Sequence, residues 1–175
     1  MATFSGGQYT NLAVLLEQLV PLYVVKGSDE SVASSTTLQD DDELFIASIP
    51  PGTWQLFGEL WVAGTSGINQ DVKYGWTFPA GTFTWSGIGL HPDWANSASN
   101  RDVVADGDVL DTSSPTNARA YGTVTGGNIP TQIMGILANT ASGTLQLQWA
   151  QNTSNADDTT LKAGSWFCLR RLDIA

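Results

Sequence analysis

The sequence predicts an all-β protein, an antiparallel jelly-roll sandwich. The chain is rich in turn-forming residues, with 18 Gly and 7 Pro among 175 residues, and this composition favours short strands joined by turns. Apolar and polar residues alternate along several runs, as at Leu145, Leu147 and Trp149, and such alternation is typical of half-buried strands. No helical pattern separates these runs, which argues against a parallel sheet with crossover helices. Two packed antiparallel sheets bury the apolar faces most simply.

The first 22 residues are expected to form an arm and a short helix ahead of a jelly-roll domain at residues 23–175. Gly6 and Gly7 favour a flexible arm over a helix. Four leucines at helical spacing predict a helix over residues 11–20, and Pro21 ends it. These leucines are Leu12, Leu15, Leu16 and Leu19. A strand within residues 19–25 is the alternative for the second half of this segment.

The strands follow in order along the rest of the chain. Residues 27–39 are rich in Ser, Thr and Asp, and we expect a loop or a short edge strand there. Residues 91–117 are long and polar, and we expect them to be mostly loop. The expected strands cover residues 43–49, 53–65, 71–78, 82–90, 118–126, 131–140, 144–153 and 165–174.

The net charge of the chain limits the classes of partner that it can bind directly. Seven Lys and Arg stand against 17 Asp and Glu, for a net charge of −10. Direct binding to nucleic acid or to an anionic membrane needs basic patches, so we expect neither. The start MATFSGGQYT has neither the basic nor the apolar part of a signal peptide, and no apolar run approaches a membrane span.

The chain carries little reactive chemistry. Cys168 is the one cysteine, which excludes an intrachain disulfide, and its apolar surroundings predict a buried small hydrophobe. A nucleophilic role would require a histidine beside it, and the one candidate is His91. The chain lacks the G-x-S-x-G motif of many hydrolases and the paired-Cys spacing of metal sites. We therefore expect no catalytic residues and no cofactor.

Two acidic segments raise the question of a metal site. Residues 39–43, QDDDE, hold four consecutive acids, and Asp106, Asp108 and Asp111 surround a glycine. Calcium needs several carboxylates that converge on one point, whereas neighbouring side chains of a strand point to opposite faces. We expect a solvated turn at residues 39–43, a charged surface loop around Asp108, and no metal.

Seven tryptophans are the most unusual feature of the composition. Buried in a core or a subunit interface, tryptophan supplies a large contact area. Exposed tryptophan instead stacks on sugar rings, and Trp94, in the polar segment HPDWANS, is the strongest candidate for such a glycan contact.

Two stretches resemble a protein type that recurs in tailed-bacteriophage genomes. The first is SSTTLQDDDELFIASIPPGTW followed by DVKYGWTFPAG, and the second is the closing GTLQLQWAQNTSNADDTTLKAGSWFCLRRL. The resemblance covers residues 34–172, is weak in its middle third, and does not include the N-terminal segment. It implies a non-enzymatic virion component of the minor structural or head-decoration type, with a jelly roll similar to tumour-necrosis-factor-like trimers.

This resemblance and the strand patterns together suggest where subunits meet. Both faces of residues 53–62 and 165–172 carry large apolar groups, although a sandwich strand of a monomer should be polar on one face. We expect a homotrimer on the particle surface, made in the host cytoplasm, that contacts the major capsid protein or another virion protein. The expected subunit interface comprises Phe57, Trp61, Trp149, Trp166 and Phe167. The N-terminal arm is expected to contact the virion lattice through Phe4, Tyr9, Leu12 and Leu16. A tail-tip or fibre head that binds a host glycan is the alternative.

Overall fold

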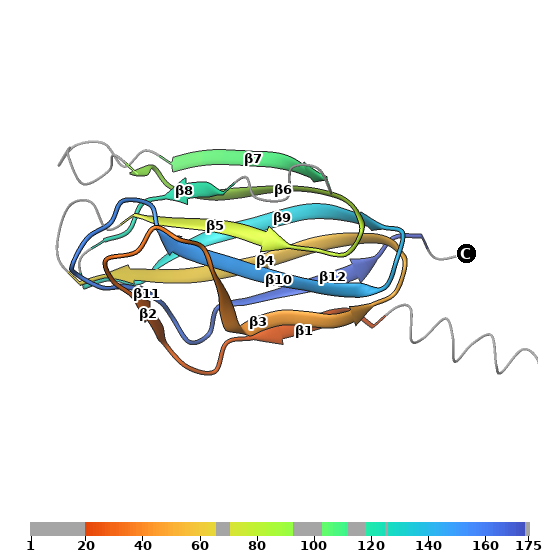
Figure 1. Ribbon diagram of the computed structural model, residues 1–175, viewed down its shortest axis with the longest axis horizontal. Helices are drawn as coiled ribbons and strands as arrows, with labels where there is room; N and C mark the ends of the chain where they lie inside the picture. Colours follow the sequence, from red (N-terminus) through yellow and green to blue (C-terminus); the bar gives the residue numbers. More distant parts are fainter. Residues whose placement is uncertain (1–19, 66–70, 93–102, 112–117, 125, 174–175) are drawn as a thin grey trace, which may run out of the picture.

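The computed structural model describes residues 20–65, 71–92, 103–111, 118–124 and 126–173 (Figure 1). Every regular element within these ranges is a β-strand, which confirms the predicted all-β class. The strands are β1 (Leu22–Val25), β2 (Glu30–Val32), β3 (Gln39–Ile49), β4 (Gly52–Gly64), β5 (Val72–Thr77), β6 (Gly81–Leu90), β7 (Val103–Asp111), β8 (Arg119–Tyr121), β9 (Ile129–Asn139), β10 (Gly143–Gln151), β11 (Thr159–Leu161) and β12 (Trp166–Arg171).

The pairing of eight strands is nested, which is the arrangement of a jelly roll. β1 pairs with β12, β3 with β10, β4 with β9, and β5 with β8, all antiparallel. These pairs form two sheets, in which β1-β12-β4-β9 faces β3-β10-β5-β8 (Figure 1). The turns at residues 50–51, 78–80 and 140–142 cross from one sheet to the other, because the two strands that each turn joins belong to different sheets.

The remaining strands extend the first sheet. β6 pairs with β9, and β7 pairs with β6 at the edge of the sheet. The short β11 pairs with both β2 and β4. We call the sheet that contains β1, β12, β4, β9, β6 and β7 the large sheet, and the sheet that contains β3, β10, β5 and β8 the small sheet.

The core lies between the two sheets and follows the predicted alternation. In β4, Trp54, Leu56, Leu60 and Val62 are buried, while Gln55, Phe57, Glu59 and Trp61 alternate with the inward positions and face outward. Trp76 of β5 lies at the centre of the core and makes edge-to-face contacts with three neighbours on the large sheet: Phe83, Trp85 and Phe167. Aromatic pairs of this geometry stabilise a core beyond their buried area.

Several predicted boundaries are wrong in informative ways. Residues 91–117 were expected to be mostly loop, but they contain β7, which pairs with β6 over nine residues. Residues 118–126 were expected to form one strand, whereas the strand there is only Arg119–Tyr121. Of the helix expected over residues 11–20, residues 11–19 lie outside the described ranges and only Val20 lies within them. The alternative, a strand within residues 19–25, is confirmed by β1.

Candidate interaction surface

The register of the large sheet brings apolar side chains into line on its outer face, the face turned away from the core. Tyr23 of β1 lies opposite Cys168 of β12, Cys168 opposite Phe57 of β4, and Phe57 opposite Met134 of β9. Their neighbours along the strands, such as Phe167, point into the core. Because side chains alternate along a strand, this line of four residues faces solvent.

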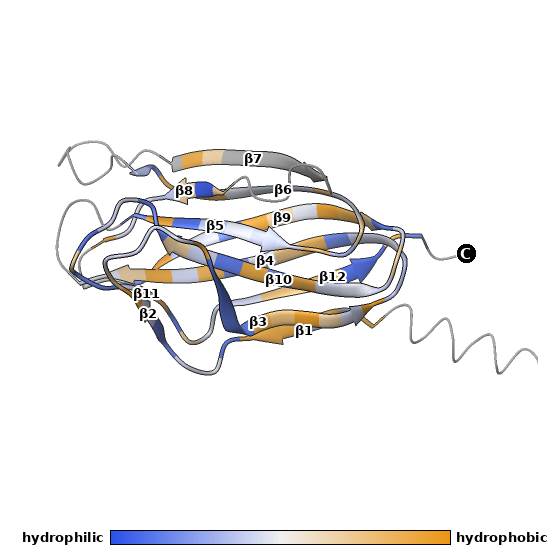
Figure 2. Ribbon diagram, viewed as in Figure 1, coloured by the Kyte–Doolittle hydropathy of each residue, from blue (hydrophilic) through white to orange (hydrophobic). Residues whose placement is uncertain are grey.

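A second line of residues widens this surface. Val25 lies opposite Trp166, and the rings of Trp166 and Phe57 meet edge to face with centroids 5.7 Å apart. Tyr23 is 71% exposed and Phe57 is 48% exposed, which is unusual for side chains of this size. We call this surface the outer apolar face; its residues are Tyr23, Val25, Phe57, Ile88, Met134, Ile136 and Trp166. Figure 2 shows the hydrophobic colouring of β1, which forms its edge.

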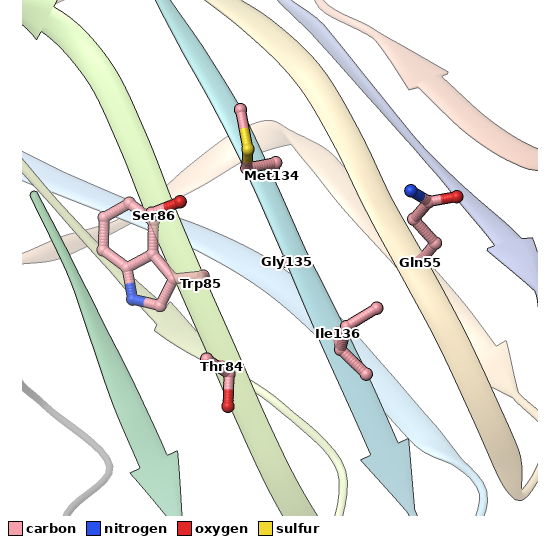
Figure 3. Close-up of a pocket in the computed structure, with 7 residues that line it drawn as sticks. All are labelled: Gln55, Thr84, Trp85, Ser86, Met134, Gly135 and Ile136. Carbon is pink, nitrogen blue, oxygen red and sulfur yellow. The ribbon is translucent and has the colours of Figure 1, made fainter. Parts of the chain in front are cut away.

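A shallow depression lies on this face over β9. Its volume is about 280 Å³. Figure 3 shows Met134 and Ile136 on either side of Gly135, with Gln55 of β4 to one side and Thr84 and Ser86 of β6 to the other. The side chains that line it are apolar groups, hydroxyls and an amide, and none of them titrates near neutral pH. The depression therefore suits packing and hydrogen bonding, not acid–base or nucleophilic chemistry.

Three of the five residues expected at the subunit interface lie on the outer side of the large sheet. Phe57 and Trp166 belong to the outer apolar face, and Trp61 lies further along β4 and is partly buried. Trp149 and Phe167 are fully buried between the sheets. Their assignment to an interface was wrong, because in β10 and β12 they occupy the inward side of the alternation. The residues expected to contact the virion lattice or a glycan, namely Phe4, Tyr9, Leu12, Leu16 and Trp94, lie outside the described residues.

Cys168 is not the buried core residue that its sequence context predicts. It lies half-buried on the outer side of β12, between Tyr23 and Phe57. Burial raises the pKa of its thiol, so the thiol stays protonated at neutral pH. His91 directly follows β6, which is separated from β12 by β4 and β9. Three strand spacings amount to about 14 Å, which places His91 too far away to activate this thiol.

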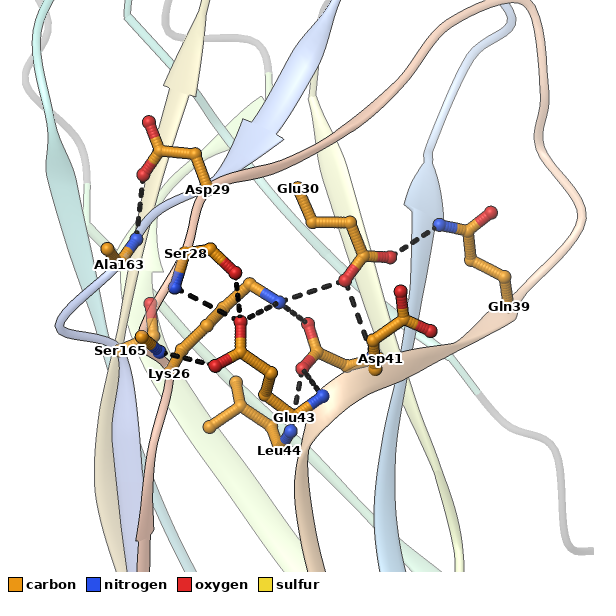
Figure 4. A network of polar contacts seen from close by, with 12 residues as sticks. Lys26, Ser28, Asp29, Glu30, Gln39, Asp41, Glu43, Leu44, Ala163 and Ser165 are labelled. Atoms are coloured by element: carbon orange, nitrogen blue, oxygen red, sulfur yellow. Dashed lines mark hydrogen bonds and ion pairs between the residues drawn. The ribbon is translucent and has the colours of Figure 1, made fainter.

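The acidic run at residues 39–43 is not the solvated turn that was expected. It forms the first half of β3, shown as a hydrophilic segment in Figure 2, and Asp41 within it is fully buried. Asp41 accepts a hydrogen bond from Lys26, which is itself only 2% exposed (Figure 4).

The described residues contain no group of three or more acidic, His or Cys side chains that would hold a metal ion. The segment with Asp106, Asp108 and Asp111 is strand β7 and not a loop.

Lys26 is surrounded by three carboxylates. Its Nζ atom lies 2.7 Å from Asp41 Oδ2, 2.9 Å from Glu30 Oε2 and 3.9 Å from Glu43 Oε1. Desolvation lowers the pKa of Lys26, but the hydrogen bonds to Asp41 and Glu30 outweigh it, and the pKa lies above its ordinary value of 10.5. We call Lys26, Glu30, Asp41 and Glu43 the lysine cluster; it joins the end of β1 to the start of β3. Sequence reasoning missed it because an isolated lysine after an apolar run gives no sign of burial.

Comparisons with known proteins find distant likenesses of fold. No known family and no curated protein matches the sequence. Among solved structures, the chain is similar to the Eiger TNF of S. frugiperda, with 10% identity, a TM-score of 0.34, and coverage of 89% of this chain and 94% of that one. It is also similar to infectious bursal disease virus, Gx strain, with 9% identity, a TM-score of 0.24, and coverage of 87% of this chain and 40% of that one. Likenesses this distant do not bear on function.

No helix in the described ranges has the length and the apolar character needed to cross a membrane.

Proposed function

We propose that this protein is a non-enzymatic structural component of a tailed-bacteriophage particle, a homotrimer that decorates the particle surface. The outer apolar face supports self-assembly. The sequence resemblance to phage virion proteins supports the location. Self-assembly and location on the particle can be tested by separate experiments.

The outer apolar face is the observation that carries the proposal. The outer side of an antiparallel sheet in a monomer is normally polar, and large exposed apolar patches mark interaction sites. Here Tyr23, Phe57 and Trp166 lie side by side on four neighbouring strands with Met134. Aromatic residues and methionine are enriched in interface cores. Burial against copies of the same chain in a closed ring would remove the face from water.

The small sheet offers a matched control for this interface. Phe45 of β3 is 43% exposed, close to the value of Phe57, but it lies on the outer side of the small sheet. We expect wild-type protein to be a trimer in light scattering, Phe57→Glu to shift the native mass to a monomer, and Phe45→Glu to leave the trimer intact. Both substitutions place a charge at an exposed site, so neither is expected to unfold the chain.

Two results would overturn the assembly proposal. One is a monomeric wild-type protein at high concentration. The other is dissociation by Phe45→Glu with no effect of Phe57→Glu, which would move the interface to the small sheet. A monomer would also favour the alternative role, a tail-tip or fibre head whose aromatic surface binds a host glycan. Tryptophan fluorescence with and without cell-wall sugars would then test that role.

The location on a particle is tested separately through the N-terminal arm. We propose that Phe4, Tyr9, Leu12 and Leu16 contact the major capsid protein or another virion protein. Deletion of residues 1–10 is expected to abolish incorporation into particles while the trimer persists in light scattering. Unchanged incorporation of the truncated chain would contradict this part of the proposal and leave the assembly proposal standing.

A further inference from the structure

The lysine cluster holds an amine and a carboxyl group in contact, out of water. Lys26 Nζ lies 2.7 Å from Asp41 Oδ2, and the two residues are 2% and 0% exposed. They are 15 positions apart in the chain and belong to different sheets, Lys26 at the end of β1 and Asp41 in β3. Permanent contact of two reacting groups replaces a bimolecular encounter by an intramolecular one, and exclusion of water disfavours hydrolysis of a product.

The second oxygen of Asp41 is held by backbone donors. Asp41 Oδ1 accepts hydrogen bonds from the N–H groups of Leu44, at 2.7 Å, and Glu43, at 3.0 Å. Two N–H groups aimed at one carboxyl oxygen stabilise the negative charge that develops there when a nucleophile attacks the carbon, as in an oxyanion hole. The two oxygens of the Asp41 carboxyl group therefore have different partners: Oδ1 accepts from two backbone N–H groups, and Oδ2 contacts the amine of Lys26.

A second carboxylate is placed to move protons. Glu30 Oε2 accepts a hydrogen bond from Lys26 Nζ at 2.9 Å, so Glu30 and Asp41 share the same nitrogen (Figure 4). Gln39 and the N–H of Asp42 also donate to Glu30, which fixes the position of its carboxyl group. A carboxylate in this position can take a proton from the amine and return it to the oxygen that leaves.

We propose that Lys26 and Asp41 condense to an intramolecular isopeptide bond. Lys26 Nζ gives a proton to Glu30 and attacks the Cγ atom of Asp41, so that the Nζ–Cγ bond forms while the charge collects on Oδ1. The Cγ–Oδ2 bond then breaks, and Oδ2 leaves as water with two protons that came from Nζ, one of them through Glu30. An ammonium and a carboxylate thus become an amide and one water, and no further reactant is needed.

Before the reaction, Lys26 and Asp41 form an ion pair. The stability of this ion pair limits the rate of the reaction. Because the pKa of Lys26 lies above its ordinary value, the first proton transfer is unfavourable, and the bond should form slowly after folding. The product joins the edges of the two sheets, since β1 and β3 are edge strands of the large and the small sheet. The exposed pair of Lys162 and Asp29 serves as a contrast, because it is open to water and is not expected to react.

The mass of the intact protein tests the proposal directly. Folded wild-type protein, incubated at neutral pH, is expected to lose the mass of one water molecule. Lys26 and Lys73 are the first two sites for trypsin in the chain, and cleavage after Lys26 is expected to disappear as the amide forms. Lys26→Arg and Asp41→Ala should retain the full mass, and Glu30→Gln should form the bond more slowly or not at all.

One other reaction of this chain also releases water, and the variants separate it. Asp106 precedes Gly107, and an Asp-Gly pair can close to a cyclic imide with the same loss of mass. That reaction would persist in Lys26→Arg. In the wild-type protein it would leave trypsin cleavage after Lys26 intact. Wild-type protein that keeps its full mass after long incubation, and is cut normally after Lys26, would overturn the proposal without reference to how any variant folds.

Discussion

At the scale of single residues, Lys26 and Asp41 show how burial changes the contribution of an ion pair to the stability of the fold. Both side chains are withdrawn from water where β1 and β3 meet. Removing one partner of a buried pair leaves an uncompensated charge and costs about 3–5 kcal/mol, whereas an exposed pair contributes about 0–1 kcal/mol. The chain contains both kinds, since the pair of Lys162 and Asp29 is exposed.

The first prediction compares these two lysines. Lys26→Met is expected to lower the free energy of unfolding by about 3–5 kcal/mol, and Lys162→Met by about 1 kcal/mol or less. Urea unfolding followed by tryptophan fluorescence measures both. Equal losses in the two variants would show that the lysine cluster is solvated in solution.

The second prediction concerns Gly58 in β4. A Cβ atom at Gly58 would lie 2.5 Å from the carbonyl oxygen of Trp166 and 2.8 Å from the Cα atom of Phe167, both of them backbone atoms of β12. Gly58→Ala is therefore expected to lower the free energy of unfolding by about 1–3 kcal/mol. Gly75→Ala is the control, because a Cβ atom there meets only the end of the flexible Leu38 side chain. A smaller loss at Gly58 than at Gly75 would contradict the close packing of β4 on β12.

At the scale of elements, Glu43 of β3 fastens the segment that follows β1. The Ser28 hydroxyl and the N–H of Gly27 donate to its carboxylate, and these hydrogen bonds hold the pKa of Glu43 below its ordinary value of 4.5. A carboxyl group whose pKa is lower in the folded state stabilises the fold above its unfolded pKa. That stabilisation is lost as the pH falls through the folded pKa.

The third prediction follows from this sign. The free energy of unfolding of the wild type should decline below about pH 4.5, and Glu43→Gln should make that decline shallower while lowering stability at neutral pH. Urea unfolding across the acid range measures both. Asp173, whose pKa Arg171 holds below its ordinary value near the C-terminal end of the sheet, provides the comparison variant Asp173→Asn. If the free energy of unfolding of Glu43→Gln declined at low pH as it does in the wild type, the Glu43 carboxylate would not contribute to this acid sensitivity.

The elements that could be predicted from the sequence are those whose burial alternates. The central strands β4 and β10 have one buried and one exposed side, so their side chains carry the period of two that predicts a strand. The short β2 and β11 span three residues each, which is too few to show a period of two in the sequence, although Val32, Thr159 and Leu161 within them are buried. The buried Asp41 was missed for a related reason, since its partner Lys26 comes from another element.

The same limit applies to the candidate surface. The sequence shows that both sides of β4 and β12 carry large apolar groups, which predicts a second buried surface. It does not show which side faces the other sheet. Strand register decides that, and register places Trp166 outside and Phe167 inside. Alternation alone leaves these two neighbours interchangeable.

At the scale of the whole molecule, the charge of the chain opposes the assembly that its outer apolar face favours. Each copy carries a net charge of −10, so identical copies repel one another at long range. Apolar contacts that hold such copies together work against this repulsion. Salt weakens the repulsion, because the screening length falls to about 10 Å at 0.1 M ionic strength, and it leaves the apolar contacts largely intact.

The last prediction is therefore that added salt strengthens the assembly. Sedimentation equilibrium at low ionic strength and at about 0.15 M should give a larger association constant in the saltier buffer. Phe57→Glu should remain a monomer in both buffers, because the charge lies inside the contact and screening does not restore the lost apolar area. Assembly held by salt bridges behaves in the opposite way and dissociates as salt is added. That outcome would move the interface away from Tyr23, Phe57 and Trp166, towards the charged edges of the sandwich.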